Sequence, residues 1–138
     1  MTEEELLALE PAALDAGIGL ALHGFEDGAA ILRLEPSALT VVNAEGDGSA
    51  YLHGGALATC VDTAAWYAVV QGREGDWVMA DMRCDFVRLA ARETHRVEAR
   101  CLRAGRMLAT VDVVIAPWDR PERAVALGRA QLARVDRG

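Results

Sequence analysis

The sequence predicts an α+β fold in which a curved antiparallel sheet wraps around one long central helix. The first observation is an apolar stretch over about residues 55–70, which is long enough for a helix and carries a single charge. The second is the presence of β-type stretches on both sides of it. The third is that short connectors join the stretches that follow it. A helix this apolar must be covered nearly all round, so the sheet is expected to curve about it.

The chain is expected to form one domain over residues 1–138. A mass of 14.8 kDa leaves no room for a second core, and a hydrophobic content of 52% is enough to fill the first. No apolar stretch reaches the about 20 residues of a membrane span. The start of the chain, MTEEELLALE, lacks the basic and apolar regions of a signal peptide. We therefore expect a soluble cytoplasmic protein with no membrane partner.

A short helix and a hairpin are predicted ahead of the long helix. Three glutamates precede leucines within the first dozen residues, as in the first turn of a helix. Residues 18–25 and 29–35 flank a Glu-Asp-Gly turn sequence, which indicates an antiparallel hairpin. Residues 36–50 include two glycines and are expected to form a loop.

Four β-type stretches follow the helix, at residues 77–89, 95–103, 107–116 and 124–135. Their short connectors favour antiparallel neighbours. From Val97 to Cys101 apolar and charged residues alternate, as in a half-buried strand, and the alternation breaks only at Leu102. A curved antiparallel sheet around a central helix is the hot-dog fold.

Charge and residue usage exclude several classes of function. The formal net charge is −7, with −10 on residues 1–62 and +3 on residues 63–138, so no nucleic-acid partner is expected. All fourteen basic residues are arginines, which excludes a lysine Schiff base and a P-loop lysine. Cys60, Cys84 and Cys101 have no CxxC spacing, and the histidines share no ligand spacing. We expect reduced thiols and no metal site.

Asp62 is the residue most informative about chemistry, because it is the only charge on the apolar helix. Burying an unpaired carboxylate is costly. Two interpretations are open. Asp62 caps a neighbouring backbone group or lies on an exposed stripe with Thr59 and Thr63. Alternatively, desolvation raises the pKa of Asp62 and suits it to act as a base or nucleophile, with Trp66 one turn on as an apolar wall.

His53, Gly54 and Gly55 stand where the long helix is expected to begin. Paired glycines allow close approach to the backbone, and a helix start presents free N–H groups to an anion or a developing oxyanion. Gly54 and Asp62 are eight residues apart, roughly 12 Å along a helix. This is too far for both to act on one carbonyl group. If both are catalytic, each works with its counterpart from another subunit, across a dimer interface.

These residues resemble the PaaI-like branch of the hot-dog acyl-CoA thioesterases. The shared pattern is His53-Gly54-Gly55, then Asp62-Thr63, then the block Asp-Met-Arg-Cys-Asp-Phe-Val-Arg that ends at Arg88, and the likeness covers roughly residues 15 to 135. The resemblance implies hydrolysis of an acyl-CoA or aryl-CoA thioester with no metal or other cofactor, since coenzyme A is part of the substrate. It also implies a homodimer at minimum, and dimers that commonly pair into a homotetramer.

The resemblance also implies roles for the residues of the pattern. The N–H of Gly54 polarises the thioester carbonyl, while Asp62 of the partner subunit attacks it or activates water. His53 and Gly55 complete the catalytic set by shaping the loop.

An Asn or Gln usually stands six residues before the motif histidine in this family, where it positions the nucleophile or the thioester. Here that position is Asp47. Asn43 fits the family's N-x-x-G pattern instead if four residues are inserted. We prefer the insertion, because a second acid near Asp62 would compete for a proton.

The remaining predicted substrate contacts are Thr63 and Trp66 on the helix and two arginines. Arg88 matches the motif arginine and Arg106 follows a glycine-containing turn, so both are expected to contact the phosphates of coenzyme A. Trp66 is equally interpretable as a core residue, and most other arginines of the sheet as solvated charges.

Two other functions remain open on the same fold. One is a non-catalytic sensor or carrier that binds acyl-CoA, and the other is a hydratase or dehydratase. A raised pKa at Asp62 favours catalysis, and an ordinary one favours binding. The sequence assigns no acyl group and leaves general-base attack and a covalent anhydride both open.

Overall fold

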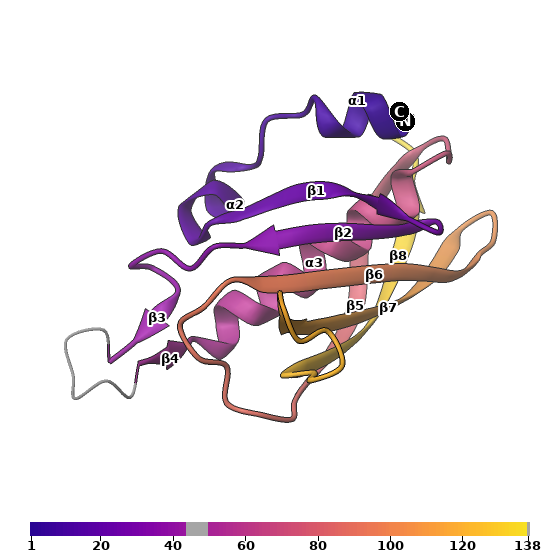
Figure 1. Ribbon diagram of the computed structural model, residues 1–138. Helices are drawn as coiled ribbons and strands as arrows, with labels where there is room; N and C mark the ends of the chain where they lie inside the picture. The colour runs from indigo at the N-terminus through magenta and orange to yellow at the C-terminus, as the bar shows by residue number, and fades with distance from the viewer. Residues whose placement is uncertain (44–49, 138) are drawn as a thin grey trace.

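The computed structural model describes residues 1–43 and 50–137, and Figure 1 shows the arrangement of its elements. In chain order they are α1 (Glu3–Leu7), α2 (Ala13–Ile18), β1 (Leu20–Glu26), β2 (Ala29–Leu34), β3 (Val41–Val42), β4 (Tyr51–Leu52), α3 (Gly54–Val70), β5 (Asp76–Phe86), β6 (His95–Ala104), β7 (Leu108–Pro117) and β8 (Ala126–Val135). No helix of these residues is long and apolar enough to cross a membrane.

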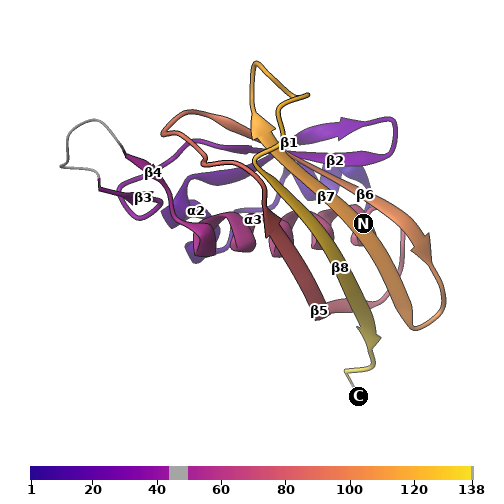
Figure 2. The same cartoon turned by 90° about the horizontal axis from the view of Figure 1, so that it is seen from below.

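The main layer is a six-stranded sheet in the order β1-β2-β6-β7-β8-β5, and every pairing in it is antiparallel. β6, β7 and β8 are neighbours in both chain and sheet, as their short connectors predicted. The expectation that the first of the four later strands would also pair with the next one was wrong: β5 pairs with β8, and β2 takes the place beside β6. The strands curve over one side of α3, as Figure 2 shows. This is the predicted hot-dog arrangement.

The central helix α3 is buried because its surface is apolar on nearly every side. Its ten buried residues are Ala56, Leu57, Cys60, Val61, Ala64, Ala65, Tyr67, Ala68, Val69 and Val70. Small residues let the sheet approach it closely: a Cβ atom on Gly128 of β8 would lie 2.6 Å from the side chain of Val61. The helix ends before Gly72, whose φ of 69° lies in the left-handed region that glycine adopts most easily. Both ends match the prediction to within one residue.

The N-terminal segment differs from the prediction. It holds two short helices instead of one, and Ile18 belongs to α2 rather than to the first strand. Gly19 separates the two elements with a φ of 86°, and a Cβ atom there would collide with the carbonyl group of Glu35. Gly19 therefore ends α2 as a left-handed C-cap, and the close approach of Glu35 leaves no space for a side chain at this position.

Two further details correct or explain the predicted strands. The expected loop over residues 36–50 contains β3, which pairs with β4 in a small separate ladder. The loop prediction was wrong there, because a two-residue strand is too short to show periodicity. The break in alternation at Leu102 coincides with a register shift in the β6–β7 pairing between Cys101 and Arg103. A bulge places two residues of one strand opposite one of the other, which interrupts the alternation.

Strand β5 lies at one edge of the sheet and pairs only with β8 among the described residues. It is a long strand with apolar side chains exposed to solvent: Val78 is 38% exposed and Phe86 is 53% exposed. An edge strand with unpaired backbone groups and exposed apolar side chains is suited to pairing with another chain.

Candidate active site

A cavity of about 520 Å³ opens between α3, the segment around α2, and β5. Its walls combine apolar and aromatic side chains with three carboxylates and two hydroxyls. The lining residues are Leu9, Glu10, Ala12, Asp15, Asp62, Thr63, Trp66, Tyr67, Val78 and Met79. The cavity therefore brings together Asp62, Thr63 and Trp66, as the sequence predicted, and no arginine lines it.

Asp62 stands on α3 at this cavity and is accessible to solvent in the single subunit. No hydrogen bond or ion pair joins its carboxylate to another residue in the described part of the chain, so the capping interpretation has no support there. Burial raises the pKa of the Asp62 carboxyl, and the negative charge of Asp15 raises it further. A carboxylate without partners and with a raised pKa has the properties of a general base or a nucleophile.

Asp15 is a member of the cavity that the sequence interpretation missed. It lies on α2 and is only 9% exposed. The Thr63 hydroxyl donates a hydrogen bond of 2.8 Å to its Oδ1 atom, across 48 positions of the chain. Asp62 was singled out as an isolated charge in an apolar stretch, and the sequence offered the same signal for Asp15, which is the only charged residue between Glu10 and Glu26.

At the start of α3 the backbone is organised by His53, the N-cap residue. Its Nδ1 atom accepts a 2.8 Å hydrogen bond from the N–H of Gly55, and its carbonyl accepts those of Ala56 and Leu57. This leaves the N–H of Gly54 without a partner among the described residues. The ring of Phe86 covers Gly54, since a Cβ atom there would lie 3.4 Å from it. The first amide of the helix is thus a free donor beside an apolar wall.

The free amide and the free carboxylate lie on one continuous helix but not in one cavity. Gly54 and Asp62 are eight positions apart on α3, so about 12 Å separates them along the axis. Gly54 does not line the cavity that holds Asp62. A single subunit therefore keeps the amide of Gly54 and the carboxylate of Asp62 apart.

The two candidates for the positioning residue belong to the segment between β3 and β4. Asn43 directly follows β3, is exposed, and has a φ of 58°, a left-handed conformation that asparagine tolerates better than most residues. Asp47 lies outside the described residues.

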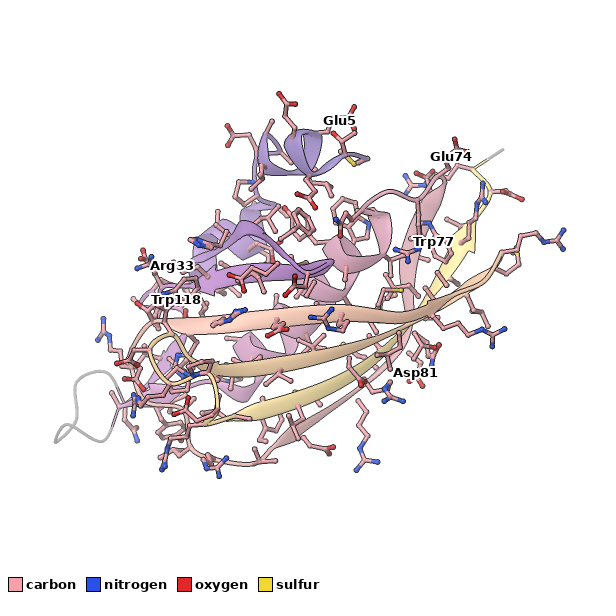
Figure 3. The ribbon with its side chains drawn as sticks, turned by 45° about the vertical axis from the view of Figure 1, so that its right-hand side comes forward. Glu5, Arg33, Glu74, Trp77, Asp81 and Trp118 are labelled. Carbon is pink, nitrogen blue, oxygen red and sulfur yellow. The ribbon has the colours of Figure 1, made fainter. Side chains whose placement is uncertain are left out.

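The two predicted phosphate-binding arginines lie at opposite ends of the sheet. Arg88 follows β5 at the end near Gly54, and one of its Nη atoms donates to the Ala124 carbonyl at 2.7 Å. Arg106 is exposed in the turn between β6 and β7, in a hollow that it shares with Arg134. In Figure 3, the labelled Trp118 lies at the end of the sheet where Arg88 is found, and the labelled Trp77 lies at the end where Arg106 is found. One subunit does not bring these arginines together.

The remaining histidines and cysteines do not form a second site in residues 1–43 and 50–137. No three or more His, Cys, Asp or Glu side chains converge there as metal ligands would. His95 is fully buried, with Nδ1 2.7 Å from the Glu93 carbonyl, and burial lowers its pKa. Burial raises the pKa of the Cys60 thiol to about 12, so this thiol stays protonated at neutral pH.

Comparisons with known proteins identify the family and the fold of this chain. The sequence profile described as "Thioesterase superfamily" matches residues 50–121, more than half of the chain, including His53, Gly54 and Asp62. No curated protein matches the chain in sequence.

Solved structures show the same fold. A conserved protein from Pseudomonas aeruginosa is 26% identical over 95% of this chain and 98% of its own, with a TM-score of 0.78. The PaaI protein from the phenylacetic acid degradation operon of E. coli is 22% identical over 91% and 86%, with a TM-score of 0.74. A thioesterase from Haemophilus influenzae is 17% identical over 99% and 92%, with a TM-score of 0.83.

Proposed function

The chain belongs to the thioesterase superfamily, and we propose that it hydrolyses acyl-CoA or aryl-CoA thioesters. The observation that carries this proposal is Asp62, a carboxylate without hydrogen-bond partners in the described structure, whose pKa is raised at an apolar cavity. A cavity of about 520 Å³ is within the range of small-molecule sites. Coenzyme A enters as part of the substrate, and the residues named below need no further cofactor.

The Gly54 amide is the proposed electrophilic group. Its free N–H donates to the thioester carbonyl oxygen and stabilises the negative charge that develops there during attack. His53 supports this role from one residue away, because its bond to the Gly55 N–H fixes the first turn of the helix. With the second amide engaged, the first one is left for the substrate.

Asp62 of the partner subunit is the proposed base or nucleophile. As a base it takes a proton from water, whose oxygen bonds to the carbonyl carbon; the C–S bond then breaks and the proton passes to the sulfur of coenzyme A. As a nucleophile its oxygen bonds to the carbonyl carbon and expels the thiolate, and water then hydrolyses the mixed anhydride. Both routes yield a carboxylic acid and the free thiol.

The shared site is supported by the open edge of the sheet. If β5 pairs with the β5 strand of a second copy about a two-fold axis, the two sheets become continuous and their α3 helices run antiparallel. The start of one helix then approaches the middle of the other, which brings Gly54 of one subunit towards Asp62 of the partner subunit. We propose a homodimer as the minimal active unit, and pairing of dimers into a homotetramer.

The same geometry accounts for the two separated arginines. In an antiparallel dimer the Arg106 end of one subunit lies towards the Arg88 end of its partner. We propose that Arg88 and Arg106 from different subunits contact the phosphates of coenzyme A, since both are exposed. Thr63 and Trp66 line the acyl side, and Asn43 or Asp47 positions the water or the thioester.

The test is the release of free thiol from short-chain, long-chain and aryl acyl-CoAs, with wild type beside Asp62→Asn. The substitution preserves size and removes the charge, so kcat/KM should fall by about 10²–10⁴-fold. Glu122→Gln, a matched charge change on an exposed connector, should retain full activity. Saturable binding of acyl-CoA without turnover would favour the sensor or carrier. Full turnover by Asp62→Asn would contradict the proposed mechanism.

A further inference from the structure

The neighbourhood of Asp62 contains a second carboxylate that the proposed mechanism does not use. Asp15 reaches the cavity from α2, a segment separate in the chain from α3. It is nine-tenths buried. Only its Oδ1 atom has a partner in the described residues, the hydroxyl of Thr63, the residue that follows Asp62. Asp15 and the candidate catalytic carboxylate of Asp62 line the same cavity.

The hydrogen bond from Thr63 makes the two carboxylates unequal. A hydroxyl that donates to a carboxylate stabilises its negative charge, and Thr63 gives its only proton to Asp15. Asp62 receives no donor from the described residues. When two neighbouring carboxylates compete for one proton, it resides on the one whose charge is less stabilised. The hydrogen bond therefore stabilises negative charge at Asp15, whereas Asp62 has no such donor in the described residues.

We infer that Asp15 is a positioning residue of the active site, whose fixed negative charge, held by Thr63, sets the pH at which Asp62 becomes an active base. The inference rests on the proposed function of Asp62. It assigns Asp15 no contact with the reacting atoms, because its effect passes through the charge of its neighbour.

The other groups around the cavity do not replace Asp15 in this role. Glu10 lines the cavity from the segment before α2, but it is exposed, so water screens its charge. Tyr67 lines the cavity from α3. Burial, and to a lesser extent the charge of Asp15, raises the pKa of the Tyr67 hydroxyl, so this hydroxyl stays neutral. β5 contributes only Val78 and Met79 to the lining. No positive side chain in the lining offsets the two aspartates.

The experiment measures kcat/KM against pH for wild type, Asp15→Asn and Glu10→Gln. The acid limb of this profile reports the protonation of the base in the free enzyme. Removing the charge of Asp15 makes Asp62 ionise more easily, so the limb should move to lower pH by about one unit. Glu10→Gln, the matched loss of an exposed charge at the same cavity, should leave the limb in place. Asp15→Ser provides a second variant without the carboxylate.

A direct titration makes the test independent of turnover. The ¹³C signal of the Asp62 carboxyl carbon, identified by its loss in Asp62→Asn, is followed against pH in wild type and Asp15→Asn. The midpoint should move down with the kinetic limb. An unchanged midpoint, or an equal shift in Glu10→Gln, would overturn the role of Asp15. Absence of hydrolysis in wild type would count against the proposed function alone, because the titration still reports on Asp15.

Discussion

The start and the middle of α3 present opposite kinds of chemical group, built in opposite ways. The start offers a backbone amide, freed by contacts that span only a few residues around His53. The middle offers a carboxylate whose environment comes from α2 and β5, distant in the chain. An electrophilic site can therefore be local, because every helix begins with unpaired N–H groups. A carboxylate with a raised pKa needs tertiary structure, because residues from distant parts of the chain must remove water from it and place a negative charge beside it.

The sharpest way to isolate the helix start is Gly54→Pro. Proline is favoured at the first helical position, and the extended conformation of His53, with ψ of 130°, suits the residue before a proline. The substitution removes the amide hydrogen with little other change. We expect kcat/KM for thioester hydrolysis to fall by about 10²–10³-fold.

Gly54→Ala is the control for that substitution, because it keeps the N–H and adds a methyl group in ordinary contact with Phe86. It should retain most of the activity. Equal losses in both variants would mean that the space at Gly54 matters and its amide does not.

Mixing two inactive subunits tests whether the two regions work together across an interface. A hybrid of an Asp62→Asn subunit and a Gly54→Pro subunit contains one intact pair of groups and one doubly damaged pair. If subunits exchange at random, thiol release should recover to about a quarter of wild type. Recovery is measured after unfolding and refolding the mixture. If the mixture stays as inactive as its components, both groups act within one subunit.

The charge of the middle region should discriminate between acyl groups. Asp15 and Asp62 both line the cavity, so an acyl chain that ends in a carboxylate meets like charges there. We expect kcat/KM for such a chain to be about tenfold lower than for its uncharged methyl ester. Asp15→Asn should reduce this difference in kcat/KM between the acid and its methyl ester. Equal rates for acid and ester in wild type would mean that the acyl group avoids this cavity.

The smallest expected effect is on stability. The pKa of Asp62 is raised in the folded state above the ordinary 3.8, so its contribution to stability is greatest below that pH and is lost as pH rises through the folded-state value. Asp62→Asn should therefore melt higher than wild type at pH 7. Because Asp62 is partly hydrated, the increase in melting temperature should be only about 1–2 °C.

Melting curves recorded between pH 3 and pH 8 check this sign. The gain should vanish in acid, where wild-type Asp62 is also neutral. Glu122→Gln should show no such dependence, and a gain that persists at low pH would assign it to packing instead.

The sequence alone determined the long helix, its start at the HGG triplet, the hairpin and the four later strands, because periodicity and turn residues act over short stretches. It also singled out Asp62 and predicted its distance from Gly54. Tertiary structure decided the features that depend on contacts between distant segments. The backbone of Glu35, directly after β2, leaves no space for a side chain at Gly19, and Asp15 joins Asp62 because α2 packs beside α3. A pattern in the chain shows that a buried charge needs a partner; only the folded protein shows which residue stands next to it.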